Sequence, residues 1–277
     1  MGTDACHACT SFIIMSGGST SFVITVSGSD ASGGAGLQAD NRAIHATGSF
    51  PLNVVTALTL QSGRGVESID LTPPELVRMH LIGLLNTYPV SVIKAGMLGC
   101  ASIVNVLAEV LEQYPSVRLV LDPVLQATSG RALLDGEGVA ALLKNLIPRT
   151  FIISPNLSEL DVLTGGTGIS NDELEKTAAS KLLEAGCLGV LVKGGHRPKG
   201  PCLDRLYVPD AVIEFSSDRI STVNTRGTGC ALASLIAGGL ANGLSLEDSI
   251  TAGKNLLTSA LKEQSESKWP GSGPAFL

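Results

Sequence analysis

The sequence is poor in aromatic residues, which make up 4% of its 277 positions, and it has no cluster of Lys and Arg. Its formal net charge is −6. Surfaces that bind nucleic acid or anionic membranes need basic patches, and those that bind nucleic acid often carry aromatic side chains as well. The composition therefore argues against both classes, and a small molecule is the expected partner.

Long apolar runs are also absent. No run reaches the roughly 20 residues of a membrane-spanning helix, and the first residues lack the basic start and apolar core of a signal peptide. The six cysteines have no spacing typical of a disulfide framework, so we expect a reducing compartment and a cytoplasmic location. Cys6 and Cys9 enclose His7 in one C-x-x-C, but no second pair follows at the spacing of a zinc site.

The rest of the sequence divides into a short extension and one domain. Residues 1–20 are rich in Ser, Thr and Gly, and residues 21–277 alternate apolar runs with amphipathic segments. The runs are typical of strands buried on both faces: FVITV (22–26), LNVVTALTL (52–60), VSVI (90–93), RLVL (118–121), TFII (150–153) and GVLV (189–192). Helices are expected near 34–47, 73–87, 102–113, 136–146, 156–164, 171–185, 228–242 and 245–264.

This alternation predicts an α/β fold in which helices cover both faces of a mainly parallel sheet, with right-handed crossovers. Residues 204–220 have a different pattern, which predicts a small β-hairpin turning at Pro209 and Asp210. Ligands of such sheets bind beyond the carboxyl ends of the strands. Polar or glycine-rich segments follow each apolar run: 27–36, Gln61, 94–97, 122–124, 155–159 and 193–196.

Three of these strand ends predict a metal and phosphate site. Asn156 and Glu159 are three residues apart at a helix start and share one face, where an amide and a carboxylate can hold Mg²⁺ directly or through water. Asp122 would complete this acidic patch. A first-turn glutamate also complements the helix dipole, so Glu159 has a second, structural explanation. Lys193, between an apolar strand and a Gly-Gly turn, is expected to meet a phosphate chain.

A further strand end suggests a heterocycle site. Gln61 ends the long apolar run 52–60, where its amide offers a donor and an acceptor to a ring edge. His45 and His80 lie within amphipathic helices and are expected to be structural.

The segment 223–243, VNTRGTGCALASLIAGGLANG, joins a Gly/Thr turn to a helix of small residues. Gly227 and Gly229 can adopt backbone angles that direct successive N–H groups at one anion, and the helix dipole adds positive potential there. Cys230 falls in the first helical turn, where the helix terminus is expected to lower the pKa of the thiol and make it a base or nucleophile. The alternative is a small buried cysteine in a tightly packed helix.

Together, an anion-binding turn, an acidic metal patch and a lysine are the parts of phosphoryl transfer from a nucleotide. The sequence has no G-x-x-x-x-G-K-[ST] and no G-x-G-x-x-G at 28–36, so a P-loop enzyme is excluded. A kinase of another type is predicted.

Seven motifs in order resemble the hydroxymethylpyrimidine/phosphomethylpyrimidine kinases of thiamine synthesis, which belong to the ribokinase-like superfamily. The motifs are GSDASGGAGLQAD (28–40), TALTLQ (56–61), IKAGMLG (93–99), LDPV (121–124), PNLSE (155–159), VKGGH (192–196) and NTRGTGC (224–230), with a G-x-G-P at 271–274. The resemblance covers about residues 21–276. It implies a ribokinase-like three-layer α/β/α domain that uses ATP and Mg²⁺ to phosphorylate 4-amino-5-hydroxymethyl-2-methylpyrimidine and then its monophosphate. A homodimer is the expected assembly.

The resemblance also assigns residues to roles. The pyrimidine would be surrounded by Gly28, Asp40, Gln61, Met97 and Val124. Asp122 and Glu159 would face Mg²⁺, whereas Asn156, Lys193 and Thr225 would face the nucleotide. Gly227, Thr228, Gly229 and Cys230 would form the anion hole, with Cys230 at the position where most sugar kinases of the superfamily carry an aspartate base. The sequence departs from the family pattern at Ala31, where proline is common, at Arg226, where histidine is common, and in its amino-terminal extension.

Three alternatives remain. A pyridoxal kinase of the same branch is the nearest, because pyridoxal also presents a hydroxymethyl group on an aromatic nitrogen ring, although Gln61 favours the aminopyrimidine. A sugar kinase is disfavoured by Cys230 and by the few polar side chains expected around the substrate. A catalytically silent ligand-binding protein would keep the fold, but the chain retains the motif residues.

Overall fold

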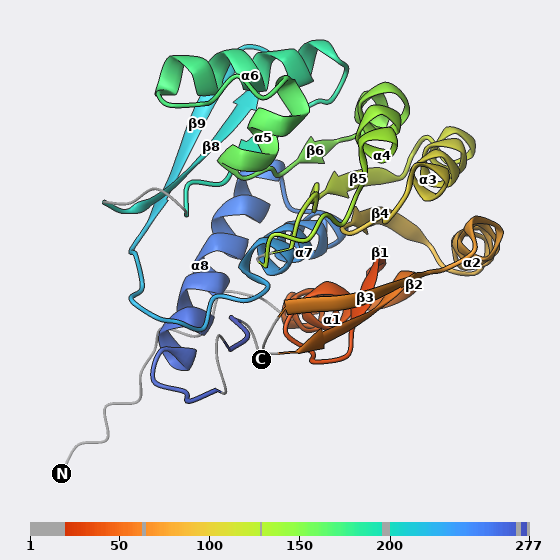
Figure 1. Ribbon diagram of the computed structural model, residues 1–277, viewed down its shortest axis with the longest axis horizontal. Helices are drawn as coiled ribbons and strands as arrows, with labels where there is room; N and C mark the ends of the chain where they lie inside the picture. The colour runs from red at the N-terminus through yellow and green to blue at the C-terminus, as the bar shows by residue number, and fades with distance from the viewer. Residues whose placement is uncertain (1–19, 63–64, 128, 196–199, 270–272, 276–277) are drawn as a thin grey trace.

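The computed structural model describes residues 20–62, 65–127, 129–195, 200–269 and 273–275 (Figure 1). The expected extension, with Cys6, His7 and Cys9, falls on residues outside these ranges except for Thr20, and so do His196 and part of the G-x-G-P motif. Within the described ranges, we find no helix with the length and apolarity that a membrane crossing requires.

One nine-stranded sheet runs through the molecule in the order β3-β2-β1-β4-β5-β6-β7-β8-β9. Neighbouring strands from β2 to β7 are parallel, whereas β3, β8 and β9 each pair antiparallel with their neighbours. The strands are β1 (Phe22–Asp30), β2 (Phe50–Ser62), β3 (Gly65–Leu71), β4 (Val90–Ala95), β5 (Arg118–Leu121), β6 (Ile152–Ile153), β7 (Val190–Val192), β8 (Cys202–Val208) and β9 (Ala211–Ser217). The predicted mainly parallel sheet and the hairpin β8–β9 are confirmed.

Helices cover both faces of the sheet, as predicted, and give three layers (Figure 1). One layer holds α2 (Pro74–Thr87), α3 (Ala101–Gln113), α4 (Gly136–Ala141), α5 (Leu157–Thr164) and α6 (Asp172–Glu184). The other holds α1 (Gly36–Ala46), α7 (Thr228–Ala241) and α8 (Leu246–Gln264). The segment 142–149 continues α4 as a wider helical turn and a short 3-10 turn. Ser245 caps α8 by accepting a hydrogen bond from the Asp248 N–H.

The alternation of side chains along the strands places a polar row on the face covered by α1, α7 and α8. On that face the apolar residues Val23, Val92, Val120, Ile152 and Leu191 belong to one core cluster. Because side chains two positions apart point to the same face, the same side carries Thr25, Lys94, Asp122, Ser154 and Lys193 at or near the carboxyl ends of the strands. The sheet register therefore brings these polar side chains together beneath α7.

The prediction that every strand is buried on both faces is wrong for β2. Leu58 and Leu60 are 59% and 53% exposed, because this half of β2 forms a hairpin with β3, a strand that the sequence pattern did not predict. The other face of the hairpin packs in a small apolar cluster of Ala57, Val66, Ile69, Met97, Val124, Ala127 and Leu133. This hairpin therefore forms one wall beside two of the predicted substrate-binding residues.

Candidate active site

The turn before α7 has the conformation that an anion-binding loop requires. Gly227 is the N-cap of α7 with φ +76°, and a Cβ atom there would lie 2.4 Å from the Gly34 carbonyl oxygen, so only glycine fits. No side chain caps the amino end of α7 among the described residues. Thr228, Gly229 and Cys230 form the first helical turn. The predicted anion hole thus lies on a helix start whose first N–H groups are free of side-chain acceptors.

Lys193 joins the predicted metal residues to this helix start. Its Nζ lies 2.7 Å from Asp122 Oδ1 and 4.0 Å from Glu159 Oε2. A Cβ atom at Gly229 would lie 3.1 Å from Nζ of Lys193 and 3.9 Å from Asp122 Oδ1. Glycine at this position therefore lets the first turn of α7 approach the lysine and the carboxylate.

Asn156 and Glu159 form a reciprocal capping box at the start of α5. The Asn156 side chain accepts a hydrogen bond from the Glu159 N–H at 2.9 Å, and Oε2 of Glu159 accepts one from the Asn156 N–H at 2.8 Å. The structural explanation for Glu159 is thus present. Its Oε1 has no partner among the described residues and is the atom left for a ligand.

The charges of this cluster are set by burial and by Lys193. Burial raises the pKa of Glu159 to about 7, the Asp122 charge adds to this, and Lys193 opposes it. Burial also works against ionisation of Asp122, but Lys193 and Lys94 hold its pKa below the ordinary value. The pKa of Lys193 is raised, because the two carboxylates outweigh its desolvation. At neutral pH the cluster therefore holds a charged Asp122–Lys193 pair beside a titratable Glu159.

The donor set fits Mg²⁺ bound together with a phosphorylated ligand. No group of three or more His, Cys, Asp or Glu with metal-site geometry occurs among the described residues, so a site built by protein ligands alone is not present there. Mg²⁺ commonly keeps several waters and uses one or two carboxylates plus substrate phosphates. Asp122 and Glu159 supply the two carboxylates.

The prediction of a lowered thiol pKa at Cys230 is wrong. Burial raises the pKa of Cys230 to about 12; Lys94 and Lys193 oppose the shift, and Asp122 and Asp40 add to it. The thiol hydrogen-bonds the Asp122 carboxylate. The helix terminus suggested a thiolate, but the surroundings of the side chain keep the proton on sulfur at neutral pH in this state.

Asp40 lies beneath the site in a fully buried ion pair. Lys94 Nζ is 2.7 Å from its Oδ1, neither side chain has any exposure, and Thr25 and Ser234 each donate to the same carboxylate at 2.9 Å. The sequence reasoning missed Thr25 and Ser234. Asp40 therefore has three protein donors and no exposed surface, so its direct contact with the pyrimidine stays a prediction that would require these donors to move.

The remaining predicted pyrimidine contacts lie at or just beyond the carboxyl ends of β1, β2, β4 and β5. A Cβ atom at Gly28 would lie 2.9 Å from the sulfur of Met97, and Met97 belongs to the same apolar cluster as Val124. Gln61 lies at the end of β2, where its Oε1 accepts a hydrogen bond from Arg226 at 2.9 Å. The four side chains or backbone positions thus combine an apolar wall with one amide.

The sequence analysis noted Arg226 only as a departure from the family pattern, in which histidine is common at this position. Its Nη2 also donates to Asp30 Oδ2 at 3.0 Å and to Ser32 Oγ at 2.8 Å. Arg226 directly precedes Gly227, and this position beside the anion-binding turn is the sequence feature that could have identified it as a site residue. Thr225, which was predicted to face the nucleotide, has an exposed side chain and accepts through its carbonyl from Thr228 Oγ1.

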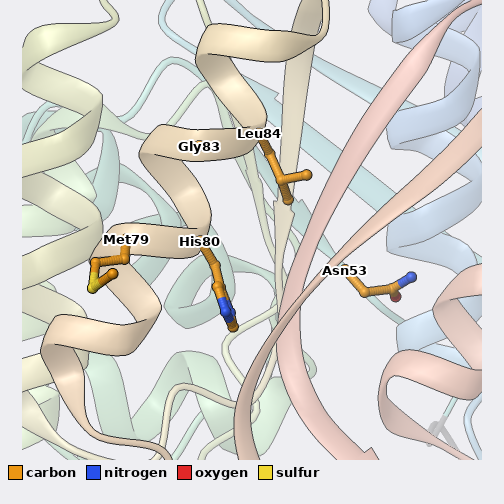
Figure 2. Close-up of a pocket in the computed structure, with 5 residues that line it drawn as sticks. All are labelled: Asn53, Met79, His80, Gly83 and Leu84. Atoms are coloured by element: carbon orange, nitrogen blue, oxygen red, sulfur yellow. The ribbon is translucent and has the colours of Figure 1, made fainter.

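A separate surface pocket lies between α2 and β2 and is lined by Asn53, Met79, His80, Gly83 and Leu84 (Figure 2). Asn53 pairs with Thr25, eight residues before Gln61 on β2, which places it roughly 25 Å from the carboxyl end of the strand at about 3.3 Å per residue. His80 is exposed, and its structural role stays a prediction. This pocket is therefore distinct from the predicted site.

The chain is similar to several known proteins. A sequence model of the family described as phosphomethylpyrimidine kinase matches residues 30–275. The thiamine biosynthesis bifunctional protein ThiED of Geobacter sulfurreducens is 40% identical over 240 residues, which are 87% of this chain and 49% of that protein. The hydroxymethylpyrimidine/phosphomethylpyrimidine kinase of Rhizobium meliloti is 36% identical over 243 residues, which are 87% of this chain and 91% of that protein. The chain thus spans about half of the first relative and most of the second.

Among solved structures, an ADP complex of Bacillus subtilis pyridoxal kinase has a TM-score of 0.84 and 26% sequence identity, covering 92% of this chain and 96% of that one. The predicted ribokinase-like architecture is confirmed by this likeness. The resemblance inferred from the seven motifs is confirmed by the family match and by relatives that are kinases. The chain therefore belongs to the phosphomethylpyrimidine kinase family.

Proposed function

We propose that this chain transfers the γ-phosphoryl group of ATP to the hydroxymethyl group of 4-amino-5-hydroxymethyl-2-methylpyrimidine, and then to the monophosphate that results. The observation that carries the proposal is the contact of the Asp122–Lys193 pair with Gly229 at the start of α7. The same sheet edge carries the apolar cluster that includes Met97 and, at the end of β2, the amide of Gln61. A nucleotide-phosphate site and a small aromatic site thus share one sheet edge.

In the proposed reaction, the acceptor oxygen attacks the γ-phosphorus while the first turn of α7 stabilises the transferring group. The N–H groups of Gly227 to Cys230 are the hydrogen-bond donors. Lys193 holds the nucleotide phosphates as a point charge, with Asn156 and Thr225 as further nucleotide contacts. Asp122 and Glu159 would hold Mg²⁺, which supplies neutralisation of charge on the phosphates when it is bound. A related structure, that of Bacillus subtilis pyridoxal kinase, is an ADP complex, which supports a nucleotide as the second ligand.

Purified protein with ATP and Mg²⁺ tests the proposal against the pyrimidine, its monophosphate, pyridoxal and ribose. We expect turnover of the first two at the highest kcat/KM. Pyridoxal is the second candidate, because a pyridoxal kinase shares the fold at a TM-score of 0.84. Preferred turnover of pyridoxal or ribose would overturn the assignment of substrate.

Gln61 is expected to decide between the pyrimidine and pyridoxal. The aminopyrimidine edge presents an exocyclic amino group beside a ring nitrogen. A glutamine amide can accept a hydrogen bond from the amino group and donate one to the ring nitrogen, whereas pyridoxal lacks this paired pattern. Gln61→Met keeps the volume but removes the hydrogen-bond partners of this polar edge. Each buried polar group left without a partner costs about 1–3 kcal/mol of binding free energy. We expect kcat/KM for the pyrimidine to fall about tenfold or more while pyridoxal turnover changes little. Equal losses would show that Gln61 supports the fold.

Glu159→Gln tests the metal side of the site. The amide keeps the shape of the side chain and can still accept from the Asn156 N–H, so the capping box survives in part, but the negative charge that would face Mg²⁺ is removed. We expect a higher Mg²⁺ concentration for half-maximal activity, measured in a titration at saturating ATP. Asp161→Asn, farther along the same helix, is the control for loss of one charge. An unchanged Mg²⁺ requirement in Glu159→Gln would limit Glu159 to capping α5.

We also propose that residues 21–277 act as one domain, that the protein is a homodimer and that it works in the cytoplasm. The exposed Leu58 and Leu60, which lie on β2, supply apolar surface that a second copy would cover. Light scattering on the purified protein measures the assembly, and cell fractionation measures the location.

A further inference from the structure

Arg226 lies between the predicted pyrimidine pocket and the anion-binding turn. It contacts Gln61 on one side through Nη2 and directly precedes Gly227 on the other. Among the described residues, its side-chain hydrogen bonds are all made by Nη2, and Nε and Nη1 have no acceptor there. The side chain is 27% exposed. The guanidinium is therefore anchored through Nη2 and packs against Gly34, and Nε and Nη1 are left as the donors for a ligand.

The arginine is held in place before any ligand binds. Its backbone N–H donates to the Gly273 carbonyl at 3.1 Å, and its carbonyl accepts from the Ala275 N–H at 2.9 Å. Its guanidinium is paired with Asp30, a carboxylate whose side chain is 2% exposed. Asp30 is itself fixed, because it accepts from the N–H groups of Gly34 and Ala35. A cation fixed in this way binds an anion without losing much side-chain freedom.

The two lysines of the site already face carboxylates. Lys94 is fully buried against Asp40, and Lys193 is paired with Asp122. Lys94 is closed to any ligand, and the proposed function already assigns Lys193 to the nucleotide phosphates. Arg226 has a partner too, but a guanidinium carries five N–H donors in a planar fork and can serve two anions at once.

We infer that Arg226 binds the phosphate of the monophosphate acceptor during the second phosphorylation, an inference that rests on the proposed function. In this step an acceptor phosphate oxygen forms a bond to the γ-phosphorus of ATP. The bond from that phosphorus to the bridging oxygen breaks, and its electron pair leaves with ADP. A phosphate monoester is largely ionised at neutral pH, so no proton has to be removed. Two anions must instead be brought together, and Arg226 offsets their repulsion.

The alcohol acceptor of the first step is neutral and depends less on this cation. Arg226→Gln is therefore expected to lower kcat/KM for the monophosphate about tenfold or more relative to kcat/KM for the alcohol, the range of a lost charge-assisted hydrogen bond. Arg226→Lys should restore part of the ratio of kcat/KM for the monophosphate to kcat/KM for the alcohol, because it keeps the positive charge but loses the planar set of guanidinium donors. Arg78→Gln on α2 removes the same charge far from the site and should leave the ratio as in the wild type.

Calorimetric titration of the monophosphate into nucleotide-free protein gives a second readout, and we expect weaker binding to Arg226→Gln than to the wild type. Equal losses on both acceptors, or equal monophosphate affinity, would mean that Arg226 only orients Gln61, and the inference would be wrong. If Arg226→Gln does not fold, Arg226→Met removes the same charge and provides the same comparison. Failure of the wild type to use either acceptor would overturn the proposed function itself.

Discussion

Replacing Cys230 by alanine is expected to lower kcat for the alcohol acceptor by about 10²–10⁴, the usual contribution of general acid–base catalysis. The thiol lies in the first turn of α7, hydrogen-bonded to Asp122, where it can exchange a proton with an acceptor held against the anion turn. Substrate binding should largely survive. Steady-state kinetics with the pyrimidine, beside Cys202→Ala on β8 as the control, measures the effect.

The pH dependence of kcat shows whether Cys230 acts as a base or as a hydrogen-bond donor. Burial raises the pKa of Cys230 to about 12, so the thiolate population increases as the pH rises toward that value. If the thiolate accepts the hydroxyl proton, kcat should rise about tenfold for each pH unit between pH 7 and 9, and Cys230→Ala should lose this slope. Cys230→Ser keeps the bond to Asp122 but forms no anion in this range. Wild-type activity in the serine variant would mean that Cys230 acts only as a hydrogen-bond donor and not as a base.

Replacing Lys193 by methionine should weaken the use of ATP more than any other change on the nucleotide side. The methionine fills a similar volume but removes the charge that Asp122 and Glu159 face, and it removes the proposed contact with the phosphates. A hydrogen bond to a charged group contributes about 1.5–3 kcal/mol, so we expect kcat/KM for ATP to fall about 10–100-fold. Initial rates across an ATP titration give this value.

Two variants make the Lys193 result specific. Lys193→Arg keeps the charge and should retain more activity than methionine does. Lys181→Met, on the exposed side of α6, loses the same charge away from the site and should behave as the wild type. An ATP dependence of Lys193→Met that matches the wild type would leave the lysine with a structural role only, as the partner of Asp122.

The sequence was sufficient to predict the site wherever the relevant contacts follow from the strand pattern. Asp122 and Lys193 each follow a short buried run, and parallel strands bring their carboxyl ends to one edge, so their location at that edge was predicted, although the 2.7 Å ion pair between them was not. The left-handed conformation of Gly227 followed from its place before a helix. These are consequences of local pattern and sheet topology.

The contacts that were missed depend on residues far apart in the chain. Arg226 and Gln61 are 165 positions apart, and no local rule indicates that their side chains meet. β3 mixes polar and apolar residues and has weak strand character of its own, so it forms only against β2. The thiol of Cys230 shows the same limit, because a helix-terminus rule takes no account of the burial that raises its pKa.

The buried pair of Asp40 and Lys94 restricts how this sequence can change by mutation. Loss of one partner leaves an uncompensated buried charge, which costs about 3–5 kcal/mol, whereas joint replacement by apolar residues of similar volume is often neutral. Selection is therefore expected to remove variants with a single substitution at either position. The two residues should change during evolution only as a pair. In a library of random variants, this would be visible as strong positive epistasis between α1 and β4.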